Sequence, residues 1–360
     1  PGPVLRDKTA SFAGDLMLYN TKNPHGGDIY AGKVLLDFSA NTNPFGTPQA
    51  VQEAIIEALP QLHRYPDPYC RKLVAAIAEH EAVPKNYILC GNGAADLIYA
   101  YARAVHPKKA AMPAPTFSEY ALGLSDCEIS YYFLQESKDF ALDSGILDFL
   151  HLEKPEVLFL CDPNNPTGRL ADPKLIEAIL ECCRDLKIRL FLDECFLDLT
   201  KNGSSRKDFL SSYPELFLLK AFTKSYGMAG VRLGYGLSAD SALLEAMSRS
   251  QQPWNISSLA QAAGIAALEQ REFLQKCVET VEKERVFLSA SLSGLGFRVI
   301  PSDTNYILFQ ARVGLADALR EKGILIRNCD NYPGLCPGWY RIAVRLPEEN
   351  QALIQAIQEV

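Results

Sequence analysis

An aspartate follows a strongly apolar run in the middle of the chain. Residues 188–192 predict a short buried strand, and Asp193 comes directly after them in the motif Asp-Glu-Cys-Phe. Taking a carboxylate out of water at such a place costs desolvation energy unless a cation meets it. Asp193 is therefore a candidate functional carboxylate, and a solvent-facing aspartate is the alternative that this position leaves equally open.

A lysine and an arginine stand close together later in the chain. Lys224 follows the apolar residues 216–219, and Arg232 comes eight residues after it, among glycines. A lone lysine is usually a solvated charge, so Lys224 indicates chemistry only when other residues support it. Two further arginines, Arg327 and Arg341, lie in predicted strands near the C-terminus. Their planar guanidinium groups suit a carboxylate or a phosphate, and surface ion pairs are the alternative.

Two loops between predicted elements carry residues suited to an anion. Residues 91–96, Gly-Asn-Gly-Ala-Ala-Asp, lie between a strand and a helix, where the backbone can approach an anion and the helix offers free N–H groups. A dinucleotide fingerprint needs glycine where Asp96 stands, which disfavours a nicotinamide cofactor and leaves a plain tight turn as the alternative. The second loop, residues 162–168, comes directly after a predicted buried strand.

The elements that must position these residues alternate between short apolar runs and amphipathic helices, which predicts parallel α/β units. The predicted strands are 87–90, 110–112, 157–161, 188–192, 216–219 and 232–237, and the predicted helices are 94–105, 117–125 and 174–186. A smaller α+β unit follows. Its predicted elements are a helical stretch at 257–292 and strands at 297–300, 306–309, 324–327 and 340–344. Ligands of open α/β sheets bind at the carboxyl ends of strands, so the loops after strands are where we expect a site.

Four motifs occur together in a fixed order. They are the 91–96 loop, Asn-Asn-Pro-Thr-Gly at 164–168, Asp-Glu-Cys-Phe at 193–196 and Thr-Lys-x(7)-Arg-x-Gly at 223–234. In order and spacing they resemble the fold-type I enzymes that use pyridoxal 5'-phosphate (PLP), such as aspartate and histidinol-phosphate aminotransferases. The resemblance covers nearly the whole chain. It implies an aspartate-aminotransferase-like α/β fold, with a mostly parallel seven-stranded sheet in a large domain and a smaller α+β domain.

The resemblance also implies an organisation. Residues 1–45 are expected to form an N-terminal segment that packs on the small domain, 46–260 the large PLP-binding domain and 261–360 the small C-terminal domain. Tyr65, in Arg-Tyr-Pro-Asp at 64–67, resembles the tyrosine that reaches the cofactor phosphate of a neighbouring subunit. This implies a homodimer with a shared active site.

Roles for individual residues follow by position. The resemblance implies that Lys224 holds the cofactor covalently and that Asp193 pairs with its pyridine nitrogen. Opposite charges 4 Å apart attract by roughly 4 kcal/mol at an effective dielectric near 20, which is enough to keep the ring protonated. Asn165 is expected to donate a hydrogen bond to the ring hydroxyl oxygen, and Phe117 is expected to stack on the ring.

The cofactor phosphate is expected to be held by backbone N–H groups and two side chains. These residues are Asn92, Gly93 and Ala94 through their N–H groups, with Thr223 and Arg232. Two positions depart from the family pattern. Ala221 stands where many relatives have serine, and Phe196 where many have tyrosine. Each change removes one hydrogen bond, and a buried partner left unpaired costs about 1–3 kcal/mol.

The substrate-binding residues implied by the resemblance are Arg341, which matches the family's substrate-anion arginine, and Arg327, which matches the second arginine of members with phosphorylated substrates. At two places the sequence resembles that of the L-threonine-O-3-phosphate decarboxylases of cobalamin biosynthesis. These places are the segment His25-Gly26-Gly27 and Phe196. Histidinol-phosphate aminotransferases usually lack that segment and have tyrosine at position 196.

Two reactions are therefore expected, in order of preference. The first is PLP-dependent decarboxylation of L-threonine O-3-phosphate to (R)-1-aminopropan-2-ol O-phosphate. The second is an aminotransferase acting on histidinol phosphate or a related amino acid with 2-oxoglutarate. The substrate bond at Cα that lies perpendicular to the cofactor ring breaks most easily, so the bound pose decides between them. A PLP-binding protein that is regulatory or catalytically idle is a third, weaker alternative.

Composition argues against several other classes. The 36 basic and 43 acidic residues give a net charge of -7, which does not favour nucleic acid. No apolar run approaches the roughly 20 residues that a membrane span needs, and the N-terminus lacks the pattern of a secretory signal. The ten cysteines form no C-x-x-C pair and show no zinc-type spacing. We therefore expect reduced thiols, no metal and a cytoplasmic protein.

Overall fold

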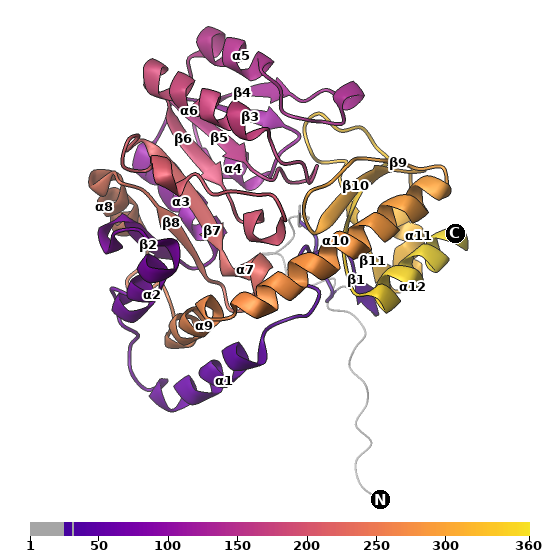
Figure 1. The fold of residues 1–360 in the computed structure, drawn as a ribbon, viewed down its shortest axis with the longest axis horizontal. Coiled ribbons are helices and arrows are strands. Elements are labelled where there is room, and N and C mark those ends of the chain that lie inside the picture. The colour runs from indigo at the N-terminus through magenta and orange to yellow at the C-terminus, as the bar shows by residue number, and fades with distance from the viewer. Residues whose placement is uncertain (1–24, 31) are drawn as a thin grey trace, which may run out of the picture.

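The computed structural model describes residues 25–30 and 32–360, and its larger unit is built on a seven-stranded sheet (Figure 1). The strands lie in the order β2-β8-β7-β6-β5-β3-β4. Their bounds are β2 Ile88–Gly91, β3 Lys109–Ala114, β4 Glu128–Phe133, β5 Val157–Cys161, β6 Arg189–Asp193, β7 Leu216–Ala221 and β8 Gly234–Leu237. Strand β8 runs antiparallel to both of its neighbours, and the other neighbouring pairs are parallel. The mostly parallel α/β sheet predicted from the sequence is confirmed.

Helices cover both faces of this sheet, which explains why β5 and β7 are buried along their whole length. The helices of this unit are α1 Gln49–Ala58, α2 Arg71–Glu81, α3 Ala94–Val105, α4 Glu119–Gly123, α5 Gly145–Glu153, α6 Pro173–Leu186, α7 Phe222–Ser225, α8 Ser241–Ser250 and α9 Ser258–Leu268. Successive strand residues serve opposite faces. The ring of Tyr101 in α3 contacts Phe159 and Phe191, whereas Leu160 and Leu192 belong to the core on the other face.

The smaller unit contains a four-stranded sheet in the order β12-β13-β10-β9. Its elements are β9 Arg298–Val299, β10 Tyr306–Gln310, β12 Arg327–Asn328 and β13 Trp339–Ala343, with α10 Arg271–Gly294, α11 Leu315–Glu321 and α12 Pro347–Gln358. Strand β1, Leu36–Asp37, pairs in parallel with β11, Ile324–Leu325, so this strand runs beside the smaller unit. The domain bounds at 45 and 260 stay predictions, and residues 1–24 lie outside the described part of the chain.

Several elements differ from the sequence prediction. The helical stretch predicted at 257–292 is two helices. The first, α9, packs on α1 and α2 of the larger unit, and the second, α10, packs on α12 of the smaller unit. The strand predicted at 324–327 is divided between β11 and β12, which belong to different sheets. Strand β4 was not predicted. It lies at the edge of the large sheet and is only half-buried, so it lacks the continuous apolar run of the central strands.

A buried lysine, Lys220, lies one residue before the end of β7. Its ammonium group is 3.3 Å from Glu81, 3.8 Å from Glu194 and 3.6 Å from Asp198. Burial acts to lower the pKa of Lys220, but the three carboxylates raise it above the usual value. The hydroxyl of Tyr235 in β8 donates to Glu81 at 2.6 Å. This network joins α2, the end of β6 and the ends of β7 and β8.

We expect Lys220→Met to lower the free energy of unfolding by about 3 kcal/mol at neutral pH, because it leaves buried carboxylates without their central cation. Glu81 sets the pH dependence. Burial acts to raise the pKa of Glu81, but Lys220, Tyr235 and Lys207 hold it at about 2. A carboxylate with a lowered folded-state pKa stabilises the fold above its unfolded pKa, and this contribution is lost as the pH falls.

The deficit of the variant, measured as the shift in the midpoint of urea unfolding, should therefore be larger at pH 7 than at pH 4. Lys174→Met, a change at an exposed lysine of α6, serves as the matched control and should leave the midpoint within error at both values. Equal deficits of Lys220→Met at pH 7 and pH 4 would show that the carboxylates are not what the lysine stabilises.

Candidate active site

The carboxyl ends of β5, β6 and β7 lie side by side, and the loops after them line a cavity of about 140 Å³. Its walls are formed by Ala94, Ala95, Phe117, Cys161, Asn165, Asp193, Cys195, Phe196, Ala221, Thr223, Lys224 and Arg232. Most of the residues expected to hold a cofactor thus surround one space. Ala95, Cys161 and Cys195 were not predicted, since small or thiol side chains beside a motif carry no chemical pattern of their own.

Asp193 is the last residue of β6 and is buried at one end of this cavity. One carboxylate oxygen accepts a hydrogen bond from the N–H of Cys195 at 2.8 Å, and the other accepts from the hydroxyl of Tyr120 at 2.6 Å. Burial raises the pKa of Asp193, while these hydrogen bonds and the charge of Lys224 act in the opposite direction. Tyr120 lies in the short helix α4, and nothing in the sequence pattern pointed to it.

Lys224 lies in α7, directly after β7. Burial and the positive charges of Arg341 and Arg232 together lower the pKa of Lys224 to about 8, and the charge of Asp193 opposes them. Its amine is 5.5 Å from the centre of the Phe196 ring. A lysine with this pKa holds a substantial neutral fraction near pH 8, and a neutral amine can attack a carbonyl group.

Because residue 93 is glycine, the side chain of Arg232 can lie directly against the loop before α3. The φ of Gly93 is +81°, and a Cβ there would lie 2.5 Å from Nη2 of Arg232. The N–H groups of Asn92 and Gly93 are used inside the turn, by the Asp96 carboxylate at 3.1 Å and the Gly91 carbonyl at 2.8 Å. Neither residue lines the cavity. From the predicted set, Ala94 lines the cavity, together with Ala95, and the phosphate-binding roles of Asn92 and Gly93 stay predictions.

Arg341, in β13, is 6% exposed and reaches the cavity wall from the smaller unit. One guanidinium nitrogen donates to the side-chain oxygen of Asn165, and another donates to the carbonyl of Ser39 at 3.0 Å. Among the described residues no carboxylate pairs with it, and its Nε has no hydrogen-bond partner. Because Asn165 accepts from Arg341 through its oxygen, its amide nitrogen is the group left for a ligand.

The other residues expected to bind substrate surround a second cavity, of about 400 Å³. Its walls are formed by His25, Gly26, Gly27, Asp28, Ser39, Ala316, Asp317, Arg320, Leu325, Ile326, Arg327 and Asn328. Arg327 is paired with Arg341 in the register of β12 and β13, and it donates to the side chain of Asn331 at 2.6 Å. Arg320, from α11, was not predicted, because a surface helix arginine is ordinarily a solvated charge.

Glycine is required at positions 26 and 27 for different reasons. A Cβ on Gly26 would lie 2.4 Å from the carbonyl oxygen of Ser39, so only glycine allows these two backbone segments to touch. Gly27 has a φ of +84°, and its N–H donates to the hydroxyl of Ser39 at 2.7 Å. Ser39 thus lines the second cavity, and its carbonyl accepts a hydrogen bond from Arg341. The same arginine donates a hydrogen bond to Asn165 at the first cavity.

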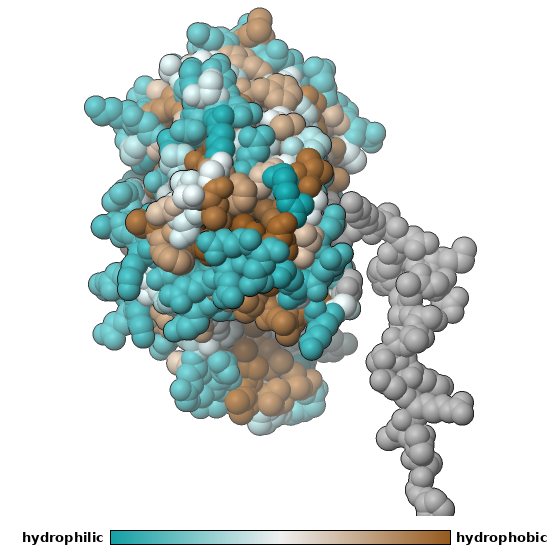
Figure 2. All heavy atoms as spheres, turned by 90° about the vertical axis from the view of Figure 1, so that its right-hand side faces the viewer, coloured by the Kyte–Doolittle hydropathy of each residue, from teal (hydrophilic) through white to brown (hydrophobic). Residues whose placement is uncertain are grey.

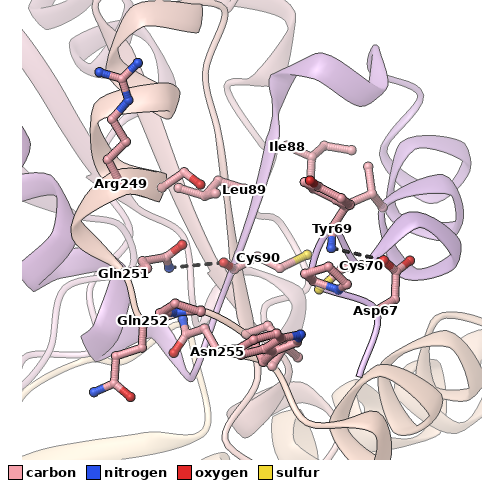
Figure 3. A pocket seen from close by; sticks show the side chains of 16 residues that line it. Asp67, Tyr69, Cys70, Ile88, Leu89, Cys90, Arg249, Gln251, Gln252 and Asn255 are labelled. Carbon is pink, nitrogen blue, oxygen red and sulfur yellow. Dashed lines mark hydrogen bonds between the residues drawn. The ribbon is translucent and has the colours of Figure 1, made fainter. Parts of the chain in front are cut away.

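Tyr65 lies apart from both cavities. Its side chain is 78% exposed and stacks on Trp254 with ring centroids 4.4 Å apart. Near this pair the segment 67–70, β2 and the segment 248–256 enclose another cavity of about 440 Å³ (Figure 3). In Figure 3 the side chain of Gln251 donates to the carbonyl of Cys90, at 3.2 Å. Within a single chain, therefore, Tyr65 does not line the space around Lys224.

The described residues contain no group of three or more His, Cys, Asp or Glu side chains that could hold a metal ion. In the same part of the chain, every helix is too short or too polar to cross a membrane. The ten cysteines are free thiols.

Comparison with known proteins agrees with this geometry. The sequence profile described as "Aminotransferase class I and II" matches residues 33–357. The threonine-phosphate decarboxylase of Salmonella typhimurium is 37% identical over 359 residues, which covers 96% of this chain and 98% of that protein.

Two solved structures show the same fold. L-threonine-O-3-phosphate decarboxylase from Porphyromonas gingivalis matches with a TM-score of 0.82 and 25% identity, over 90% of this chain and 99% of that chain. The histidinol-phosphate aminotransferase from Clostridium acetobutylicum matches with a TM-score of 0.84 and 27% identity, over 90% of this chain and 98% of that chain. The family predicted from the four motifs is confirmed. The chain belongs to the aminotransferase class I and II family.

Proposed function

We propose that this chain binds PLP in the cavity around Lys224 and decarboxylates L-threonine O-3-phosphate to (R)-1-aminopropan-2-ol O-phosphate, a reaction of cobalamin biosynthesis. The observation that carries the proposal is that one buried residue, Arg341, hydrogen-bonds to the walls of both cavities, through Asn165 and Ser39. A phosphorylated amino acid can therefore lie with its amine near Lys224 and its phosphate in the second cavity. Similarity to threonine-phosphate decarboxylases over nearly the whole chain supports the same substrate.

The cavity suits PLP at each of its functional groups. The buried carboxylate of Asp193 suits a pyridine nitrogen that carries a proton, and the ring of Phe117 suits stacking. The first residues of α3, with Thr223 and Arg232, suit a phosphate, because a helix N-terminus attracts anions. When bound, PLP supplies an electron sink for the electron pair left by a bond broken at the substrate Cα.

Lys224 has two tasks in this proposal. Its amine would hold the cofactor through the aldehyde carbon, and once the substrate is bound it would hold a proton for the substrate Cα. A pKa of about 8 allows both, because the amine changes between its neutral and charged forms near neutral pH. Asn165, held by Arg341, would direct its amide nitrogen to the ring oxygen.

The substrate pose selects the reaction. If Arg327, Arg341 and the segment His25-Gly26-Gly27 hold the phosphate, the carboxylate is free to lie perpendicular to the cofactor ring. The Cα–carboxylate bond would then be the one that breaks, leaving its electron pair to the bound cofactor and releasing carbon dioxide. An aminotransferase would instead direct the Cα–H bond toward Lys224. The TM-score of 0.84 to a histidinol-phosphate aminotransferase keeps this as the second candidate function.

A homodimer with a shared active site is part of the proposal. Tyr65 is exposed in the single chain, as expected for a residue that serves a partner. Figure 2 shows apolar side chains at the lower end of the molecule, at the height of α1 in Figure 1. In α1 and directly after it, Ile56, Leu59 and Leu62 are 62%, 45% and 58% exposed. Such a surface suits burial against a second copy. The free thiols support a cytoplasmic location.

A paired assay on PLP-loaded protein tests the reaction. One arm supplies L-threonine O-3-phosphate alone and follows carbon dioxide. The other supplies histidinol phosphate with 2-oxoglutarate and follows glutamate. We expect carbon dioxide without any requirement for a keto acid. Glutamate formation alone would make the chain an aminotransferase and refute the decarboxylase.

Lys224→Ala should abolish covalent attachment of the cofactor and reduce turnover by roughly 10³-fold or more, because both the nucleophile and the proton donor are lost. The measurement is borohydride reduction followed by mass spectrometry of the labelled peptide. The matched control is Lys174→Ala, at an exposed lysine. In this variant borohydride should still attach the cofactor to Lys224, and activity should equal that of the wild type. An active Lys224→Ala protein would overturn the mechanism.

Arg341→Ala should weaken binding of the phosphorylated substrate by roughly 10–100-fold, because hydrogen bonds to a charged group contribute about 1.5–3 kcal/mol. Cofactor affinity should change far less, since Arg341 contacts the cavity only through Asn165. Titrations of PLP into the apoprotein and of substrate into the loaded protein give the two constants. If both weaken equally, Arg341 serves the fold or the cofactor and not the substrate.

A further inference from the structure

A buried tyrosine, Tyr120, stands behind the carboxylate of Asp193. It lies in α4, and it is not part of the wall of the cavity around Lys224. Its hydroxyl donates to one oxygen of Asp193 at 2.6 Å, and the N–H of Cys195 donates to the other at 2.8 Å. Because Tyr120 and Asp193 are both buried, bulk water does not take the place of the hydroxyl when it is removed.

Packing fixes the position of this hydroxyl. The ring of Tyr120 lies nearly parallel to that of Phe159, with centroids 5.6 Å apart and an interplanar angle of 25°. It meets the ring of Phe117 edge to face, at 5.7 Å and 83°. Both are favourable aromatic geometries. Tyr120 therefore connects two groups that the proposed cofactor would contact, the ring of Phe117 and the carboxylate of Asp193.

The groups around Asp193 act on its charge in different directions. Burial raises the pKa of Asp193 and so favours the neutral acid, while Cys195, Tyr120 and the charge of Lys224 favour the carboxylate. Burial and the nearby carboxylate raise the pKa of Tyr120 well above its usual value, so its hydroxyl keeps its proton and donates. The thiols of Cys195 and Cys161 also stay protonated, because burial raises their pKa values. Tyr120 is therefore a neutral donor that stabilises an ionised Asp193.

We propose that Tyr120 is a positioning residue that keeps Asp193 ionised and oriented toward the pyridine nitrogen of PLP. This role rests on the proposed function and deepens it, because Tyr120 would set the charge of the cofactor ring without touching the cofactor. A proton between a carboxylate and a pyridine nitrogen can lie on either group. A second donor to the carboxylate lowers its affinity for that proton, so the proton stays on the nitrogen. The protonated ring withdraws electrons more strongly.

The chemical shift of the ring nitrogen reports where this proton lies. The protein is loaded with PLP that carries ¹⁵N in its pyridine ring, and the nitrogen resonance is recorded without substrate. Wild type should show a protonated pyridine. Tyr120→Phe keeps the aromatic ring and loses the hydroxyl. The proton equilibrium should then move toward the carboxylate by roughly 10–100-fold, because the lost hydrogen bond was made to a charged group. The resonance should lie closer to that of neutral pyridine, and a wild-type chemical shift would overturn the role of Tyr120.

Tyr101→Phe is the matched control. Tyr101, in α3, contacts Phe159 in the same aromatic cluster, and its buried hydroxyl makes no hydrogen bond to any described residue. This variant should keep the wild-type nitrogen resonance and the wild-type kcat. Tyr120→Phe should instead lower kcat for L-threonine O-3-phosphate about tenfold, with KM changed much less, because the hydroxyl acts on the charge of the ring and not on substrate binding.

A double-mutant cycle and a second variant separate this role from a merely structural one. On an Asp193→Asn background, Tyr120→Phe should leave the nitrogen resonance and kcat unchanged, because its effect acts through the missing carboxylate. A further change in either quantity would refute the role. If Tyr120→Phe is too unstable to be loaded with PLP, 3-fluorotyrosine at position 120 keeps the ring shape and makes the hydroxyl a stronger donor. The resonance should then stay at the wild-type position or move further toward protonated pyridine, and a displacement toward the neutral form would contradict the role.

The two proposals can fail separately, because the nitrogen resonance is recorded without substrate. If wild type releases carbon dioxide and Tyr120→Phe keeps the wild-type resonance, the role of Tyr120 is wrong and the proposed function stands. If loaded wild type releases no carbon dioxide and Tyr120→Phe displaces the resonance, the decarboxylase is wrong and the role of Tyr120 is supported. A neutral ring nitrogen in wild type would refute the role of Tyr120 alone, and a wild type that takes up no PLP would overturn both proposals.

Discussion

The register between β6 and β7 is the constraint on which the site depends. Asp193 is paired with Leu219 in this register, and successive residues point to opposite faces of the sheet. At the end of β6, Asp193 lines the cavity while Glu194 faces the buried network behind it. At the end of β7, Ala221 lines the cavity while Lys220 meets Glu194. A slip by one residue would exchange these roles, because it would turn every side chain to the other face.

In this arrangement burial shifts the pKa values of the reactive groups while the fold stays stable. Burial raises the pKa of Asp193 and lowers that of Lys224, so both are shifted toward their neutral forms when no ligand is present. Lys220, on the reverse face, is buried too, but three carboxylates keep it charged. The strand ends are thus held together by a satisfied ion cluster on one face. On the other face the charges are incompletely matched, which suits a cofactor that brings complementary groups.

Much of this could be predicted from sequence because the decisive residues follow apolar strands. Asp193 and Lys224 stand directly after such runs, and their motifs identify both the family and the edge of the sheet. Tyr120 could not be found in this way, since it lies on a short helix and its contact is with Asp193, far along the chain. The loop before α3 shows a finer limit. The motif was recognised, but only the hydrogen bonds of the turn show that Asn92 and Gly93 are already occupied.

The two cavities explain how one scaffold can serve two reactions. Arg341 holds Asn165 on one side and the backbone of Ser39 on the other, so a substrate anion that binds it also affects both cavity walls. Under the proposed function, a substrate carboxylate bound by Arg341 would leave the Cα–H bond as the one that faces Lys224. A phosphate bound by the arginines would instead leave the Cα–carboxylate bond free to break. In this proposal the residues around the second cavity would decide which anion binds where, although none of them needs to contact the bond that breaks.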